Sequence, residues 1–155
     1  MQNILLTAFL ILYIALVGIA QVVPEDLAEL KKLNSELSDS RKNQDSTLAL
    51  VISQKILVIS NRAYGTESNE AATVHHNMGL IYSELNNFVE SEKSYKQAVA
   101  IYQKDTVKNI DVLVKIWLRL GNVVVNQKKF DEAETIYLQT IQAVEQQFGK
   151  NDKRL

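Results

Sequence analysis

Two adjacent histidines, His75 and His76, are the only imidazoles in the chain and the first candidates for chemistry. A histidine can act as a metal ligand or as a general base. Neighbouring residues on a helix point about 100° apart, so these two side chains cannot hold one metal ion together. The chain has no cysteine, which excludes thiolate metal sites, thiol nucleophiles and disulfides. We therefore interpret His75 as a packing residue and His76 as a side chain that faces an inner surface, and we expect no metal and no cofactor.

Charged groups are the remaining candidates. Lys115 and Arg119 are four residues apart, share one helix face and form a local positive spot. Four carboxylates stand near helix starts, where capping and the helix dipole explain them: Glu90, Glu92, Glu132 and Glu134. The chain contains no phosphate-binding loop, zinc-protease helix, nucleophile elbow or dinucleotide fingerprint. We therefore expect that the protein is not an enzyme.

The balance of charge excludes one class of partner. The chain has 155 residues, 17 basic and 18 acidic side chains, and a net charge of -1. Nucleic-acid binding normally needs a clustered basic excess, so we expect no nucleic-acid partner. The length indicates one domain.

The segment 1–20 differs from the rest because it carries no charged side chain. Residues 4–20 are almost entirely apolar and end in Gly18-Ile19-Ala20, two small residues two positions apart. This pattern is typical of a secretory signal peptide, here cleaved after Ala20, and predicts a secreted or periplasmic protein. The alternative is an uncleaved membrane anchor, since an apolar run of about 17 residues lies at the lower limit for spanning a bilayer. In that case Lys31, Lys32 and other basic residues favour a cytoplasmic location for the downstream part.

An internal repeat runs through the remaining chain. A shift of 42 superposes Gly79 on Gly121 and gives identities at eight of the 31 positions in 79–109. The other identical pairs are Phe88 and Phe130, Glu90 and Glu132, Glu92 and Glu134, Tyr95 and Tyr137, Gln97 and Gln139, Lys108 and Lys150, and Asn109 and Asn151. A weaker first copy aligns Ser53 with the two tyrosines and has Leu37 at the glycine position.

Each copy predicts a helix, a short turn, a second helix and a longer loop. Apolar residues spaced by three and four predict helices over 71–85 and 110–126, followed by second helices over 88–102 and 131–148. Upstream, Pro24 starts a helix, and the first turn covers 41–46. Asp131 is predicted to cap its helix. Gly79 and Gly121 should let paired helices approach closely, as should Ser91 and Ala133 on the second helices. The bulky side chains expected between pairs are Phe88, Phe130, Tyr95 and Tyr137.

The residues of the two clear copies resemble the tetratricopeptide repeat. The third copy has Trp117, Leu120, Gly121, Val124, Ala133, Tyr137 and Thr140 at the family's intervals, and the second has His75, Met78, Gly79, Tyr82, Ser91, Tyr95 and Ala98. The long period and the loops around Gly65 and Gly149 are similar to the kinesin-light-chain type. The resemblance implies an all-α fold, a right-handed α-solenoid of helix–turn–helix repeats behind the N-terminal apolar helix. Its domain would span 21–155, with repeats at 25–63, 70–104 and 110–148.

In this family the first helices of the pairs line the concave face, and the resemblance therefore implies a partner-binding groove for a protein or a peptide. The residues expected on it are Asn34, Thr73, His76, Asn77, Leu80, Lys115, Arg119, Asn122 and Asn126. Amide side chains offer a donor and an acceptor and can pair with a peptide backbone.

Some members clamp the C-terminal carboxylates of peptides with basic and amide side chains. The matching positions hold Asn34, Ser38, Asn77, Lys115 and Arg119, of which the last three agree with the family's residue types. This match implies a partial anion-binding site. The alternative is a solvated face that binds no anion.

Two further readings of the function remain open. One is that the chain is the N-terminal sensor or regulatory fragment of a larger signalling or catalytic protein. The other is self-association through the last helix, because no polar helix follows to cover Ile136, Ile141, Val144 and Phe148. A membrane is expected as a partner only if residues 4–20 remain uncleaved.

Overall fold

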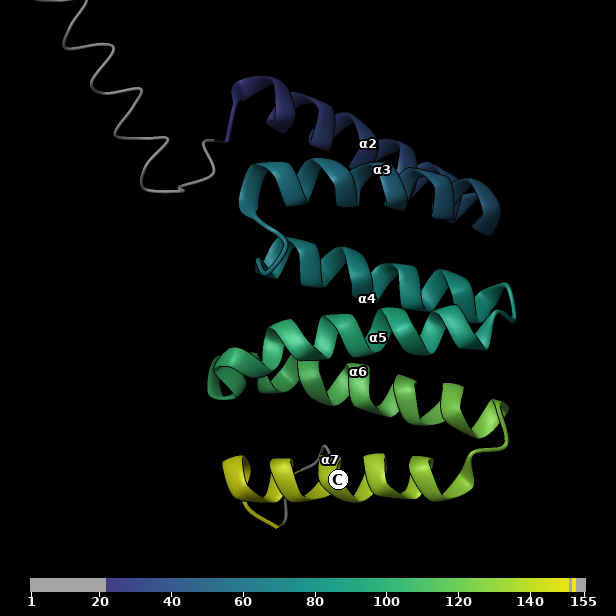
Figure 1. The fold of residues 1–155 in the computed structure, drawn as a ribbon, viewed down its shortest axis with the longest axis vertical. Helices are drawn as coiled ribbons and strands as arrows, with labels where there is room; N and C mark the ends of the chain where they lie inside the picture. Colours follow the sequence, from purple (N-terminus) through teal and green to yellow (C-terminus); the bar gives the residue numbers. More distant parts are fainter. Residues whose placement is uncertain (1–21, 151, 153–155) are drawn as a thin grey trace, which may run out of the picture.

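The computed structural model describes residues 22–150 and 152, which form a single stack of helices (Figure 1). The helices are α2 (Pro24–Lys42), α3 (Ser46–Tyr64), α4 (Asn69–Glu84), α5 (Phe88–Tyr102), the short 3-10 helix η1 (Gln103–Asp105), α6 (Thr106–Asn126) and α7 (Phe130–Phe148). Within this part of the chain there is no strand, and the predicted all-α solenoid of helix pairs is confirmed. The expected signal peptide, membrane anchor and apolar helix fall on residues outside the described range. None of the described helices is sufficiently long and apolar to pass through a membrane.

Substantial packing joins each helix only to the helices before and after it along the sequence. The packed pairs are α2 with α3, α3 with α4, α4 with α5, α5 with α6, and α6 with α7. Such nearest-neighbour packing is the arrangement that defines a solenoid.

The turns inside the three pairs share one geometry and are evenly spaced along the sequence. Gln44, Asn86 and Lys128 each take a positive φ, at 58°, 56° and 62°. In the third turn the Lys128 amide donates to the Val125 carbonyl and the Lys129 amide to that of Val124, at 2.8 and 3.1 Å. The same two bonds close the other turns, as in the Schellman motif that ends many helices. The first copy therefore has the same period as the other two.

The paired helices approach closely where the sequence has glycine, as predicted. A Cβ atom added to Gly79 would lie 2.7 Å from two ring carbons of Tyr95, and one added to Gly121 would overlap the Tyr137 ring. The buried Ser91 hydroxyl donates to the Gly79 carbonyl at 2.7 Å, which ties α5 to α4. A small residue on one helix therefore makes room for an aromatic ring on the other.

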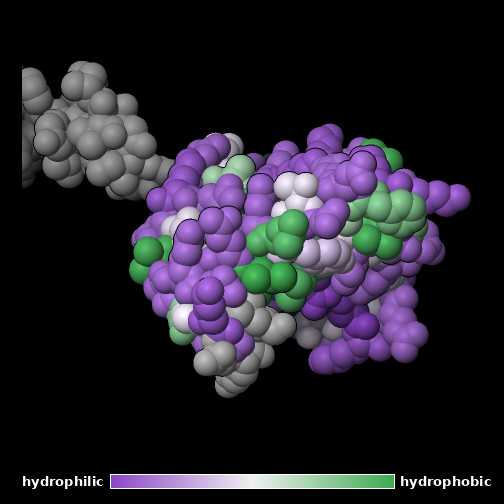
Figure 2. All heavy atoms as spheres, turned by 90° about the horizontal axis from the view of Figure 1, so that it is seen from below, coloured by the Kyte–Doolittle hydropathy of each residue, from purple (hydrophilic) through white to green (hydrophobic). Residues whose placement is uncertain are grey.

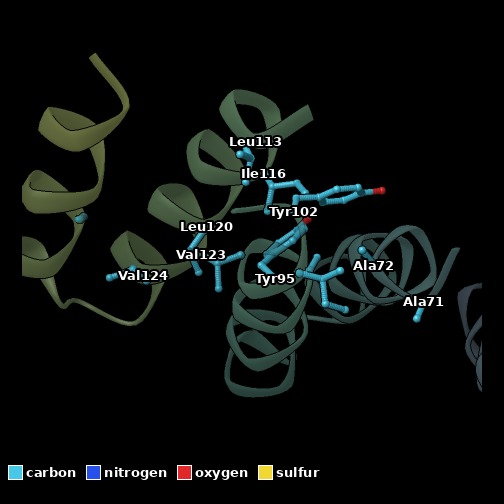
Figure 3. Close-up of a cluster of buried hydrophobic side chains, with 12 residues drawn as sticks. Ala71, Ala72, Tyr95, Tyr102, Leu113, Ile116, Leu120, Val123 and Val124 are labelled. Atoms are coloured by element: carbon cyan, nitrogen blue, oxygen red, sulfur yellow. The ribbon is translucent and has the colours of Figure 1, made fainter. Parts of the chain in front are cut away.

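The largest core cluster lies where α4, α5 and α6 meet (Figure 3). Tyr95 and Tyr102 are 1% and 6% exposed, and they lie in the same cluster as Ala71 and Ala72 of α4. The residues of α6 in this cluster are Leu113, Ile116, Leu120, Val123 and Val124. The two tyrosine rings thus fill the junction between the second and third pairs.

The connection between the second and third pairs differs from the prediction of a longer loop. Helix α5 passes through η1 directly into α6, which begins at Thr106 and so four residues before the predicted start. In the other two places where a second helix ends, Gly65 and Gly149 stop it with φ values of 93° and 89°. The position one repeat period after Gly65 holds Val107, which has no such freedom, so the chain remains helical there.

Two predictions about α7 are wrong. Asp131 does not cap the helix: α7 begins at Phe130, the capping position holds Lys129, and no side chain bonds there. Phe130 does not fill a gap between pairs, because it is 63% exposed. Its counterpart Phe88 is half-buried because the turn after α6 covers it, and the Gln127 side-chain amide donates to its carbonyl at 3.1 Å.

Glu92 has a different role from the helix-start role expected of it. Its carboxylate accepts hydrogen bonds from Lys129 at 2.8 Å, Gln127 at 2.7 Å and Lys96 at 2.5 Å. Burial raises the pKa of Glu92, but these bonds outweigh burial and hold it at about 2. The side chain therefore ties α5 to the turn between α6 and α7.

Candidate binding groove

Three hollows lie on one side of the stack, between the first helices of successive pairs. We call this side the first-helix face; it is formed by α2, α4 and α6, and the second helices α3 and α5 form its floor. The hollows measure about 250, 130 and 240 Å³. They follow one another along the stack from α2 to α6.

The first hollow lies between α2 and α4, above α3. Leu30, Asn34 and Leu37 come from α2, and Glu70, Thr73, Val74 and Asn77 come from α4. The floor from α3 consists of Ser53, Ile56, Ser60 and Tyr64. Apolar walls with amide and hydroxyl groups are the usual composition of a site that binds an organic group.

The other two hollows continue the groove toward α6. The smaller one is lined by Leu37 and Arg41 of α2 and by Asn77, Leu80 and Ile81 of α4. The last is lined by Leu80, Ser83 and Glu84 of α4, Tyr95 of α5, and Arg119 and Asn122 of α6. In this hollow the floor is a tyrosine ring, whereas the first has serines there.

Six of the nine residues predicted for the groove line these hollows. Asn34, Thr73 and Asn77 line the first, and Leu80, Arg119 and Asn122 line the last. Three of the nine predicted residues already bond within the protein through their side-chain amides. The Asn34 amide donates to the Leu30 carbonyl, the Asn126 amide donates to the Asn122 carbonyl, and the Asn122 side-chain oxygen accepts from the Tyr137 hydroxyl, each at 2.8 Å. These bonds orient the amides and hold them on the surface.

The remaining predicted residues, His76, Lys115 and Asn126, line none of the hollows. His76 is half-buried with its ring centroid 6.0 Å from that of Tyr95, and its Nε2 is buried without a partner. Burial lowers the pKa of His76, and the positive charges of Arg119 and Lys115 lower it further. Burial also lowers the pKa of His75. The positive spot expected from Lys115 and Arg119 therefore acts on the His76 side chain.

The five positions compared with a carboxylate clamp are spread along the face. Asn34 and Asn77 line the first hollow and Arg119 the last, while Ser38 and Lys115 are exposed and line neither. No single hollow contains both Asn77 and Arg119.

The floor of the first hollow was not predicted from the sequence. Ser53, Ser60 and Tyr64 on α3 contribute to the site, although only first helices were expected to. A signal was present, since Ser53 stands where the other two copies have tyrosine. A small polar residue at a position that otherwise holds a buried ring indicates unfilled space.

Within residues 22–150, no group of three or more His, Asp or Glu side chains is placed to hold a metal ion. The first-helix face is an open groove on a stack of helix pairs. The stack of helix pairs places the protein in the class of α-solenoids. Residues 38–104 match the model of the tetratricopeptide repeat family, so this segment of the chain consists of tetratricopeptide repeats. No curated protein matches the chain. Repeats of this family generally mediate interactions between proteins.

Proposed function

We propose that the protein is a non-catalytic scaffold that binds a protein or peptide segment along its first-helix face. The observation that carries the proposal is the row of three hollows between α2, α4 and α6. Each hollow is of a size for one side chain, while ligand sites for drug-sized molecules are usually larger, about 300 to 1,000 Å³. A row of side-chain-sized hollows suits an extended peptide.

The polar groups between the hollows support a peptide over a small apolar ligand. Asn77 stands between the first two hollows, and Asn122 lines the last. An amide can donate to a carbonyl and accept from an N–H, so it pairs with the peptide backbone whatever the peptide's sequence. The hollows then select side chains and the amides hold the backbone.

The test is a selection of peptides from a random library against the full chain, followed by measurement of Kd. Asn77→Ala together with Asn122→Ala should weaken binding roughly tenfold, since each lost hydrogen bond is worth about 0.5–1.5 kcal/mol. The control is Gln54→Ala, because Gln54 is exposed on α3 and lines none of the hollows. Peptides that bind equally to both variants would place the binding surface elsewhere and refute the proposal.

We further propose that Lys115 and Arg119 favour an acidic group on the partner. Both are exposed on α6, and both lower the pKa of His76 through their charge. Lys115→Ala together with Arg119→Ala should weaken binding of selected peptides and reduce its dependence on salt. If salt weakens binding to the variant as much as to the original chain, no charge on the partner is recognised here.

Self-association through α7 is a second candidate, supported by the face that α7 turns outward. Ile141 and Phe148 are 43% and 38% exposed, as predicted, and Leu138 is 59% exposed. Val144 was also expected on this face, but it is fully buried against α6. In Figure 2, which looks onto the α7 end of the stack, hydrophobic side chains gather among hydrophilic ones. The mass in sedimentation equilibrium should fall to that of a monomer in Leu138→Glu. A monomeric original chain would exclude this candidate.

For the location of the protein we propose export and cleavage after Ala20, on the apolar pattern of residues 4–20. Sequencing of the N-terminus from an extracytoplasmic fraction should begin at Gln21. A membrane-bound chain that retains Met1 would favour the anchor instead.

A further inference from the structure

The first hollow stands where the next pair carries two tyrosine rings. One repeat period separates Ser53 from Tyr95 and Ser60 from Tyr102. Both serines are buried on the floor of the hollow, and both tyrosines are buried in the core between α4, α5 and α6. Leu37 stands where the second pair has Gly79, so its side chain takes up part of the space that the Tyr95 ring fills there. Because a serine side chain ends at its hydroxyl, the rest of that space is not filled by Ser53 or Ser60. The hollow of about 250 Å³ is what remains.

The Ser53 hydroxyl is an unsatisfied polar group at the base of this space. The residue is fully buried, and its Oγ has no hydrogen-bond partner. Among the described residues, four other buried hydroxyls have a carbonyl partner: Ser94 donates to Glu90 at 2.8 Å, Thr140 to Ile136 at 2.7 Å, Ser91 to Gly79 at 2.7 Å and Ser40 to Leu37 at 2.9 Å. Buried polar groups nearly always have a partner, so the Ser53 hydroxyl requires an explanation.

The walls indicate what could enter. Leu30, Ile56 and Val74 present apolar surface. Asn34 on α2 and Asn77 on α4 add side-chain amides to the walls. The one charged residue that lines the hollow is Glu70, whose carboxylate would repel an anionic guest. The hollow therefore suits a neutral group with an apolar body and a polar tip.

We propose that the first hollow binds one 4-hydroxyphenyl group, as in a tyrosine side chain of a partner peptide, with the Ser53 hydroxyl as the hydrogen-bond partner of the phenol. This inference rests on the proposed function, since it assigns one side chain of the peptide to one hollow of the groove. Internal tyrosines of α5 occupy the corresponding space between α4 and α6, which shows that the scaffold accommodates such rings. Buried tyrosine hydroxyls usually find a hydrogen-bond partner, and Ser53 offers one.

The test compares N-acetyl-tyrosinamide with N-acetyl-phenylalaninamide, which differ by the hydroxyl alone. Each is titrated into the full chain while amide chemical shifts are followed by NMR. The tyrosine compound should bind roughly two- to tenfold more tightly, the range expected for one hydrogen bond, with the largest shifts around Ser53 and Thr73. In Ser53→Ala, which keeps the space, the two compounds should bind equally.

A second variant fills the hollow. Leu37→Gly together with Ser53→Tyr installs the combination that the second pair has in Gly79 and Tyr95. This variant should bind neither compound, while Ser94→Ala, which removes a hydroxyl outside the hollow, should bind both as the original chain does. If the filled variant does not fold, as judged by circular dichroism, the comparison in Ser53→Ala decides alone.

The proposal is overturned if the compounds bind equally to the original chain, if neither binds, or if the filled variant still binds them. Its failure is distinguishable from that of the proposed function. Peptides selected on the chain and weakened by the Asn77 and Asn122 changes would still establish the groove, whatever the first hollow accepts.

Discussion

The contact between Gly79 and Tyr95 predicts a substitution whose effect on stability changes sign with its partner. A methyl group on Gly79 would approach two Tyr95 ring carbons to 2.7 Å. The ring is 1% exposed and is packed in the core cluster with residues of α4 and α6. Overpacking of this kind costs about 1–3 kcal/mol, whereas alanine in a helix interior gains about 1 kcal/mol over glycine. Gly79→Ala should therefore destabilise the protein by about 1 kcal/mol.

In a Tyr95→Ser background the same change should stabilise the protein. The ring that the methyl group would meet is absent, so only the gain in helix propensity remains, again about 1 kcal/mol. The two effects differ by roughly 2 kcal/mol, which is the coupling energy expected between residues in direct contact. Tyr95→Ser alone should cost about 4 kcal/mol because it empties a buried site.

Urea unfolding of the four chains, followed by circular dichroism, measures this cycle. If Tyr95→Ser is too unstable to fold in buffer, the same concentration of trimethylamine oxide is added to all four chains, because this osmolyte raises the free energy of unfolding. Equal effects of Gly79→Ala in both backgrounds would refute the reasoning, because they would show that the Tyr95 ring does not determine the cost of a methyl group at this position. Gly121 is a weaker test, since its partner Tyr137 is only half-buried and can move.

Three further predictions concern the connections of the stack. The pKa of Glu92 is held at about 2, below its usual 4.5, so its contribution to stability is complete above pH 4.5 and is lost as the pH falls toward 2. Urea unfolding across this range should show that the free energy of unfolding falls more steeply in the original chain than in Glu92→Gln. Parallel pH dependences in the two chains would contradict this prediction. Lys128→Gly should stabilise the protein by about 1 kcal/mol, because a non-glycine residue at a φ of 62° is strained, and an unchanged urea midpoint would argue against strain. Asp26→Ala should lower the melting temperature because its buried carboxylate pairs with Arg62, whereas Lys32→Ala, at an exposed pair 3.8 Å from its carboxylate, should leave it unchanged.

The sequence predicted the parts of the fold that depend on spacing. The repeat period, the helix pairs and the close approach of paired helices at Gly79 and Gly121 follow from local patterns, and the surroundings of the two glycines agree with them. That a tyrosine ring fills the space beside each glycine was not predicted. The helix that begins at Thr106 was placed too late, because the loop prediction relied on a glycine that the second copy lacks. The shared geometry of the three turns could not be predicted either, because their positive-φ residues are glutamine, asparagine and lysine, which have no common preference for a positive φ.

The groove could be predicted on one side only. Asn34, Thr73 and Asn77 follow from the resemblance to the tetratricopeptide repeat, which implies that the first helices line the binding face. The floor depends on which side chains leave space across the stack, and a helical pattern does not contain that information. Ser53 looked like a faded copy of a tyrosine, and only the surrounding walls show a hollow there. Glu92 was misjudged for the same reason, because its partner Lys129 belongs to the next pair.

The nearest-neighbour packing of the described helices has a mechanical consequence. Since no substantial contact joins α2 and α3 to α6 and α7, a pull on the two ends of the stack loads the junctions in series. Each junction can then yield by itself, so extension should proceed in separate steps of a helix pair at low force, with the remaining pairs still folded. A guest lying across two junctions would bridge them and resist the first of those steps.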